Sequence, residues 1–144
     1  MGDVVVPINY VAVLAAAVVS MVVGYVWYGP LFGKTWMKEM GMKQQQMTDA
    51  MKKQMMNSYT LMFVGSLFMS WVLAHAIVFS AAYLHMSGLS EGLMTGFFNW
   101  LGFVGPVTLG SVLWEKKSWK MWSINNGYYV VTLMAMGAVL ALWP

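Results

Sequence analysis

The sequence has no cysteine and no arginine, and only 9% of its 144 residues are charged. Without cysteine there can be no disulfide, no thiolate nucleophile and no cysteine-ligated metal. Ordinary soluble domains carry about a quarter charged residues, whereas 60% of this chain is hydrophobic. A water-soluble domain of this length could not bury so much apolar surface. The composition therefore predicts an integral membrane protein.

Long apolar runs support this prediction, because a spanning helix needs about twenty apolar residues. Four stretches qualify, at about 8–28, 59–83, 93–114 and 122–143. None contains Lys, Asp or Glu in its interior, and none alternates with a period of two, which favours helices over barrel strands. We predict one all-α domain, 1–144, folded as an integral membrane four-helix bundle. The polar segment at about 33–57 is predicted to be a cytoplasmic amphipathic linker.

The lysines are confined to two connections. Five lie between the first and second spans, and three lie between the third and fourth: Lys34, Lys38, Lys43, Lys52 and Lys53, then Lys116, Lys117 and Lys120. By the positive-inside rule both connections are cytoplasmic and both termini are outside. We predict a multi-pass protein of the bacterial inner (cytoplasmic) membrane. The net charge of +3 follows from this topology, so no nucleic-acid partner is predicted.

Proline and capping residues predict where the helices end or bend. Gly29-Pro30 is expected to end the first helix, because proline cannot donate the next hydrogen bond. A short surface helix should follow, with Trp36 dipping into lipid. Thr48 is a helix-start residue, and one long helix is expected from there to about Tyr83. Pro106 predicts a kink in the third span.

Small residues recur every four positions in the first two spans. They are Ala12, Ala16, Ser20 and Gly24 in the first span, and Ser66, Ser70 and Ala74 in the second. Small side chains on one helical stripe let another backbone approach closely in lipid. We predict that these stripes are helix-packing faces, which meet each other or a neighbour.

His75 and Asn99 are polar residues inside predicted spans. Each lies about nine residues, or about 13 Å at helical rise, from the outer end of its span, so the two side chains could meet. An intramembrane ionisable residue is a functional hypothesis by default. Two interpretations stay open. One is a structural clasp that contributes about 1 kcal/mol, and the other is a proton-responsive or ligand-binding site.

A second polar group is expected near the cytoplasmic face. Its members are Tyr25, Tyr28, Thr108, Ser111, Asn125, Asn126 and Tyr128. Together they would form an inner vestibule that binds a lipid head group or a small polar ligand. Ordinary interfacial hydrogen bonding is the alternative interpretation.

Familiar catalytic and metal-binding motifs are absent from the sequence. It contains no nucleophile elbow, glycine-rich phosphate loop, HExxH motif or paired carboxylate, so we predict no catalytic residue, no metal and no cofactor. The stretch "MKEMGM" has a spacing seen in thioether Cu(I) sites. Methionine also fills irregular gaps in apolar packing, which is the interpretation we favour for the sixteen methionines.

Four motifs resemble a bacterial family of small four-span membrane proteins, domain of unknown function 1761. They are "WYGPLFGKTWMKEMG", the "LAH" of the second span, "WLGFVGP" and "SWKMWSINNGYYVVTLMAMGAVL". The resemblance covers nearly the whole chain, and the linker at 43–53 matches least. It implies a four-helix membrane fold, but no activity and no functional residues. Lys34-Thr35-Trp36 and Lys117-Ser118-Trp119 also echo each other, so a parallel duplication of helical hairpins is an alternative origin of the bundle.

Three functions are compatible with these features. The favoured one is a non-enzymatic helix-packing protein, surrounded by membrane lipids, that self-associates or belongs to a larger membrane complex. The first alternative is a small oligomeric transporter or channel with His75 and Asn99 lining the path. The second alternative is a membrane enzyme that binds a lipid or quinone at the inner vestibule.

Overall fold

A computed structural model describes residues 6–42 and 48–143, and in these residues it contains helices and no strands. The elements are α1 (Tyr10–Val26), the π turn η1 (Trp27–Leu31), α2 (Gly33–Glu39), α3 (Asp49–Leu84), α4 (Gly88–Asn99), the π turn η2 (Trp100–Val104), α5 (Gly105–Thr108), α6 (Gly110–Leu113) and α7 (Trp119–Leu142). Consecutive elements join into four spans, Tyr10–Leu31, Asp49–Leu84, Gly88–Leu113 and Trp119–Leu142. The predicted all-α, four-span membrane fold is therefore confirmed.

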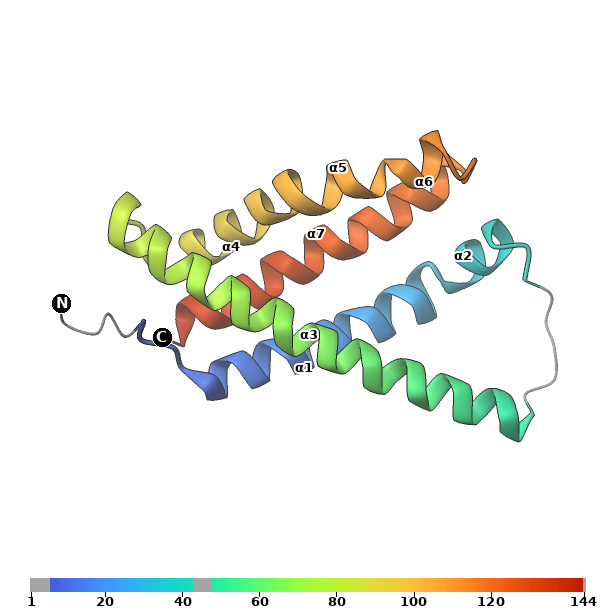
Figure 1. The fold of residues 1–144 in the computed structure, drawn as a ribbon, viewed down its shortest axis with the longest axis horizontal. Helices are drawn as coiled ribbons and strands as arrows, with labels where there is room; N and C mark the ends of the chain where they lie inside the picture. Colours follow the sequence, from blue (N-terminus) through green and yellow to red (C-terminus); the bar gives the residue numbers. More distant parts are fainter. Residues whose placement is uncertain (1–5, 43–47, 144) are drawn as a thin grey trace.

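Helix α7 is the most buried of the four spans, and it packs against α4 and α1, while α1 also packs against α3 (Figure 1). The apolar core lies where α1, α3 and α7 meet. Its buried members are Ala12, Val13, Ala16, Leu73, Ala74, Ile77, Leu133, Met136 and Leu140.

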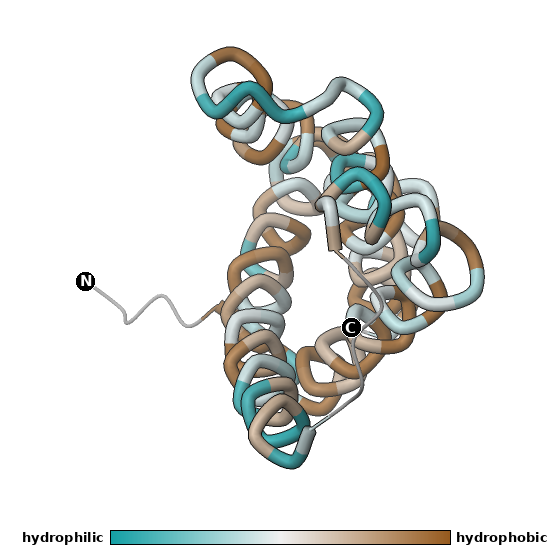
Figure 2. The backbone as a smooth tube through the Cα atoms, turned by 90° about the vertical axis from the view of Figure 1, so that its right-hand side faces the viewer, coloured by the Kyte–Doolittle hydropathy of each residue, from teal (hydrophilic) through white to brown (hydrophobic). Residues whose placement is uncertain are grey.

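The two ends of the bundle differ. The start of α1 and the end of α7 lie together, with Asn9 Nδ2 donating to the Trp143 carbonyl at 3.5 Å; we call this the terminal end. The two lysine-bearing connections lie at the opposite end, which we call the lysine end (Figure 1). Figure 2 views the molecule from the lysine end, where hydrophilic residues gather on the nearest turns and apolar residues follow the length of the helices. Residues 43–47 of the predicted linker lie outside the described residues.

The first span does not stop at Gly29-Pro30, so that prediction is wrong. The chain widens into the π turn η1, in which the Phe32 N–H donates to the Trp27 carbonyl at 2.8 Å. The wider turn accommodates a proline ring that has no N–H of its own. The helix consequently continues to Leu31, and Trp27 and Tyr28 both contact α7.

The third span is also irregular near its proline, at the place where a kink was predicted. The π turn η2 precedes Pro106, and the Gly105 N–H donates to the Trp100 carbonyl. The span begins at Gly88 rather than at about 93, which places Glu91 in its first turn, 4% exposed. The third span therefore contains an acidic residue, which lies just outside the predicted bounds of about 93–114.

The long helix predicted from Thr48 is confirmed as α3. Thr48 Oγ1 accepts from the Met51 N–H at 3.2 Å, and the helix ends before His85, which is left-handed with φ 53°. Its 36 residues span roughly 54 Å, well beyond a hydrocarbon core of about 30 Å. Residues 49–62 are all exposed. Helix α7 begins slightly before its predicted start, where Ser118 Oγ accepts from the Met121 N–H at 3.1 Å.

The two small-residue stripes meet inside the chain. Ser20 and Ser66 share a hydrogen bond of 2.7 Å between their hydroxyls, and Ser70 Oγ donates to the Val13 carbonyl at 2.8 Å. Ala12, Ala16 and Ala74 of the stripes are also buried, whereas Gly24 is half-buried and faces Tyr128 of α7. Close approach of α1 and α3 depends on these small side chains.

Glycines make the contact between α4 and α7 even closer. A Cβ added at Gly92 would collide with the Gly137 carbonyl, and one added at Gly96 would collide with the Leu133 carbonyl. Gly92 and Gly96 form a G-x-x-x-G pattern, the signature of such contacts in membranes. This pattern was not among the sequence-based predictions, although the spacing of Gly92 and Gly96 is visible in the sequence.

Candidate functional site

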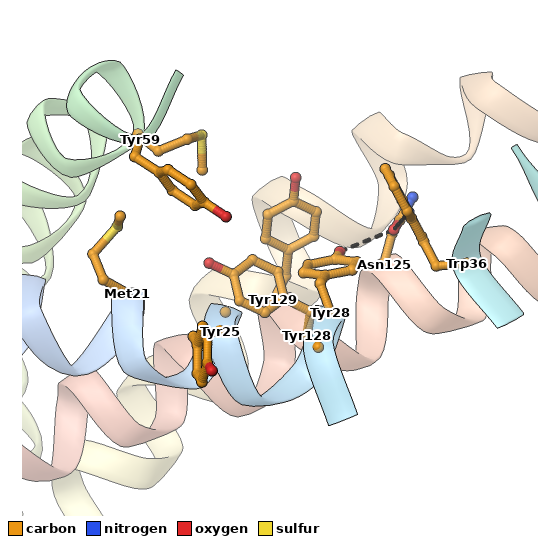
Figure 3. Close-up of a pocket in the computed structure, with 11 residues that line it drawn as sticks. Met21, Tyr25, Tyr28, Trp36, Tyr59, Asn125, Tyr128 and Tyr129 are labelled. Carbon is orange, nitrogen blue, oxygen red and sulfur yellow. Dashed lines mark hydrogen bonds between the residues drawn. The ribbon is translucent and has the colours of Figure 1, made fainter. Parts of the chain in front are cut away.

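A cavity of about 470 Å³ opens at the lysine end between α1, α3 and α7. Its wall is mainly aromatic, and the residues labelled in Figure 3 are Met21, Tyr25, Tyr28, Trp36, Tyr59, Asn125, Tyr128 and Tyr129. We call it the tyrosine pocket. Four of its tyrosines come from the first span and from α7, and Tyr59 reaches towards them from α3 (Figure 3).

Asn125 organises one wall of the tyrosine pocket. Its Oδ1 accepts from the Tyr28 hydroxyl at 2.9 Å and from Trp36 Nε1 at 3.2 Å. A single amide oxygen, with two lone pairs, thus joins the first span, α2 and α7. Trp36 faces the bundle, and the prediction that it dips into lipid is wrong.

Helix α2 is held against the bundle by its start and its end. Gly33 is buried at its start, where a Cβ would collide with the Tyr28 carbonyl, so only glycine permits this fold-back. At its end Glu39 accepts from the Ser118 hydroxyl and lies 3.8 Å from Lys120 Nζ. These contacts fix Trp36 at the edge of the tyrosine pocket.

The aromatic rings of the pocket pack on one another. The ring centroids of Tyr28 and Tyr128 are 5.1 Å apart, and those of Tyr28 and Trp36 are 5.6 Å apart, within the range of favourable aromatic pairs. The hydroxyls of Tyr25, Tyr59 and Tyr129 form no hydrogen bond within the described part of the chain. Three hydroxyls are therefore available to a bound molecule.

No Lys, Arg, Asp, Glu or His is among the described residues that line the tyrosine pocket. Met21 and Met62 supply apolar wall. The pocket thus combines hydrogen-bonding hydroxyls with apolar and aromatic surface and has no formal charge. Such a surface suits an uncharged amphiphile, since an anionic head group would find no cationic partner in this wall.

The rest of the predicted vestibule forms an adjoining cavity of about 270 Å³. Thr108, Ser111 and Asn126 line this cavity, and Asn125 and Tyr129 line both cavities. The vestibule residues are therefore brought together in two neighbouring hollows. In the second hollow Asn126 Oδ1 accepts from Trp100 Nε1 at 3.0 Å and from Thr108 Oγ1 at 3.1 Å, so its amide mainly holds the third span to α7.

His75 and Asn99 are both half-buried, and each hydrogen-bonds to its own helix. His75 Nδ1 lies 2.8 Å from the Trp71 carbonyl. A carbonyl only accepts, so Nδ1 carries the proton. Asn99 Nδ2 donates to the Thr95 carbonyl at 2.8 Å. Within the described chain no hydrogen bond joins His75 to Asn99, and neither residue lines the tyrosine pocket or the adjoining cavity.

Sequence reasoning missed Tyr59, Tyr129 and Trp36 as members of the tyrosine pocket. Tyr129 adjoins Tyr128 and follows the Asn125-Asn126 pair, and this local density of polar and aromatic residues was a usable signal. Tyr59 gave no such signal, because its place depends on how α3 crosses α1, which no local pattern specifies.

Comparison with known proteins identifies a family and adds no activity. Searches of curated proteins and of solved structures found no match. A family model, described as protein of unknown function (DUF1761), matches residues 11–141. That match covers both π turns and all four spans except Tyr10 and Leu142, and the chain therefore belongs to the DUF1761 family.

Proposed function

We propose that this protein is a membrane binding protein for an uncharged amphiphile with a planar, hydrogen-bonding head, such as an isoprenoid quinone. The observation that carries the proposal is the tyrosine pocket, whose lining is aromatic, uncharged and rich in unpaired hydroxyls. Quinone carbonyls accept hydrogen bonds from phenols, and the aromatic rings provide flat surfaces for a planar head.

The position of the pocket fits a ligand dissolved in the bilayer. Tyr59 lies where the exposed, polar first turns of α3 give way to its apolar length. A head group held near Tyr59 would sit at interfacial depth, where tyrosine and tryptophan are favoured. An apolar tail could then follow Met21 and Met62 towards the hydrocarbon.

Self-association was the favoured function at the sequence level, and its argument rested on the small-residue stripes. Those stripes are used within the chain, through Ser20–Ser66 and Ser70–Val13 contacts. They no longer argue for contacts between copies or with a larger complex. Transport along His75 and Asn99 has no observation in its favour beyond the cost of placing a histidine in a membrane.

The proposed orientation of the protein in its membrane follows from the distribution of lysines along the chain. We propose the bacterial inner membrane, with the lysine end cytoplasmic and both termini outside, by the positive-inside rule. The tyrosine pocket would then face the cytoplasmic leaflet.

Binding of a benzoquinone carrying a decyl tail to the purified protein in detergent tests the proposal. Quinones quench tryptophan, and Trp36 lies in the pocket wall, so quenching should saturate. Tyr59→Phe and Tyr129→Phe each remove a free hydroxyl and keep the ring, and each should weaken binding roughly threefold to tenfold, the loss expected for one hydrogen bond. Tyr83→Phe is the matched control, since Tyr83 is 79% exposed in the last turn of α3, away from the pocket.

A blocking variant makes the test sharper. Gly29 lines the pocket, and a Cβ added there would meet no atom within 4 Å. Gly29→Leu should therefore fill the pocket without a backbone clash and abolish saturable quenching. Unchanged affinity in Gly29→Leu, or equal weakening in Tyr83→Phe and Tyr59→Phe, would rule out binding in this pocket.

A further inference from the structure

Glu91 lines a third cavity, of about 280 Å³, at the terminal end of the bundle. The site lies at the opposite end from the tyrosine pocket, and nothing in the proposed function uses it. Glu91 is only 4% exposed, although it carries a carboxyl group inside a span that extends from Gly88 to Leu113. A carboxylate buried to this extent requires compensation.

The protein compensates Glu91 only in part. Ser80 Oγ donates to Glu91 Oε1 at 2.9 Å, but the same hydroxyl lies 2.9 Å from the Ile77 carbonyl. A hydroxyl has one proton and cannot serve both acceptors at once. Glu91 Oε2 accepts no hydrogen bond within the described chain, and no described lysine or histidine pairs with Glu91.

Glu91 has no positively charged partner among the described residues of this cavity. Glu91 lies in the first turn of α4, where the free N–H groups and the helix dipole stabilise negative charge. No other charged side chain is among the described residues that line this cavity. The carboxylate is therefore short of a positive partner and of hydrogen-bond donors, both of which a ligand could supply.

The walls of the cavity indicate the chemistry of such a ligand. They are mainly aliphatic, with Ala74, Ile77 and Leu140 among them, and Trp143 adds an aromatic surface. Ca²⁺ takes six to eight oxygen ligands, and Mg²⁺ keeps several bound waters; mainly aliphatic walls suit neither a large set of oxygen ligands nor a hydrated ion. An ammonium group offers three donors to a carboxylate, while aliphatic and aromatic walls accommodate its apolar part and an aromatic face attracts cations.

We propose that Glu91 and this cavity bind a small monovalent organic cation, namely a primary ammonium with a compact apolar group. The volume of about 280 Å³ is just below the range of about 300–1,000 Å³ typical of drug-sized ligands, so the apolar group is one ring or a short chain. The ammonium pairs with Glu91, and the ring or chain lies against the aliphatic wall.

Equilibrium dialysis of the purified protein in uncharged detergent tests this site with two probes of the same shape. Phenethylammonium carries the charge, and phenylethanol replaces the ammonium with a hydroxyl. The wild-type protein should bind phenethylammonium at least about tenfold more tightly than phenylethanol, because a desolvated charge pair is lost with the alcohol. Equal binding of the two probes would overturn the proposal without any variant.

Substitutions at Glu91 and in the cavity wall test whether the cation binds at this site. Glu91→Gln should remove the preference for the cation, and Glu91→Asp should keep most of it. Glu115→Gln is the matched control, since Glu115 lies outside this cavity and pairs with Lys117 at 2.7 Å. If Glu91→Gln fails to fold, Ala81→Leu gives the same information, because Ala81 is an exposed wall residue and leucine narrows the cavity while leaving Glu91 in place. A cation preference that survives Glu91→Gln or Ala81→Leu would assign Glu91 a purely structural role between α3 and α4.

Discussion

Trp27 and Trp100 each begin a π turn, and both donate their indole N–H to the same short segment of α7. Trp27 Nε1 donates to the Ile124 carbonyl at 2.9 Å, and Trp100 Nε1 donates to Asn126 Oδ1 at 3.0 Å. One turn of the central helix thus fixes the first and third spans together. This correspondence between the halves accords with the parallel duplication considered from the sequence, which stays a prediction.

Gly127 provides the room for the Trp27 indole, and we predict that Gly127→Ala destabilises the fold. A Cβ at Gly127 would lie 2.7 Å from Trp27 Cζ2, so the indole would have to move and lose its bond to α7. The expected cost is about 1–3 kcal/mol, measured by chemical unfolding in detergent. Gly65→Ala is the control, because a Cβ there meets nothing within 4 Å and alanine is favoured in a helix by about 0.5–1 kcal/mol. Equal stability of the two variants would contradict the close packing of Trp27.

Ser20 and Val22 lie two residues apart on α1, and substitution by leucine should lower the melting temperature at Ser20 but not at Val22. Ser20 is 1% exposed and bonds to Ser66, whereas Val22 is 56% exposed. Ser20→Leu should separate α1 from α3 and lower the melting temperature markedly, while Val22→Leu should be nearly silent. The comparison needs only thermal unfolding of the two variants beside the wild type. The same melting temperature for both would mean that the stripe faces lipid.

We predict that Asn125 stabilises the fold through its side-chain amide oxygen, which accepts two hydrogen bonds. Asn125→Leu leaves the Tyr28 hydroxyl and the Trp36 indole, both half-buried, without their acceptor, at an expected cost of about 1 kcal/mol for each hydrogen bond lost. Asn125→Asp retains an acceptor oxygen and should lose less stability. Stability from chemical unfolding, together with the accessibility of Trp36 to a soluble quencher, measures both effects. A larger loss for aspartate than for leucine would refute this role of the oxygen.

The absence of cysteine makes the orientation directly measurable. Ser87→Cys marks the connection between α3 and α4, and Lys116→Cys marks the connection before α7; both positions are exposed. We predict that a membrane-impermeant maleimide labels Ser87→Cys from outside intact cells and labels Lys116→Cys only after the membrane is opened. The reverse pattern would invert the proposed topology.

The features that depend on composition and local spacing were predictable from the sequence. The four spans, the long α3 with its Thr48 cap, and the irregular third span at Pro106 all follow from hydropathy, capping and proline chemistry. Features that depend on tertiary contact were not. The π turn at Pro30 comes with contacts of Trp27 and Tyr28 to α7, and Glu91 in the first turn of α4 accepts a hydrogen bond from Ser80 of a neighbouring helix. The rotation of each span about its own axis decides which polar residues meet, and hydropathy does not predict this rotation.

The uncharged lining of the tyrosine pocket has an electrical consequence. A charge that crosses the whole membrane field gains or loses about 2.3 kcal/mol per 100 mV, and ionic attraction weakens as salt rises. A neutral molecule held by hydroxyls and rings feels neither effect. Occupancy of this pocket would therefore follow the concentration of its ligand in the bilayer, and it would remain the same in an energised and a de-energised cell and across wide changes in salinity.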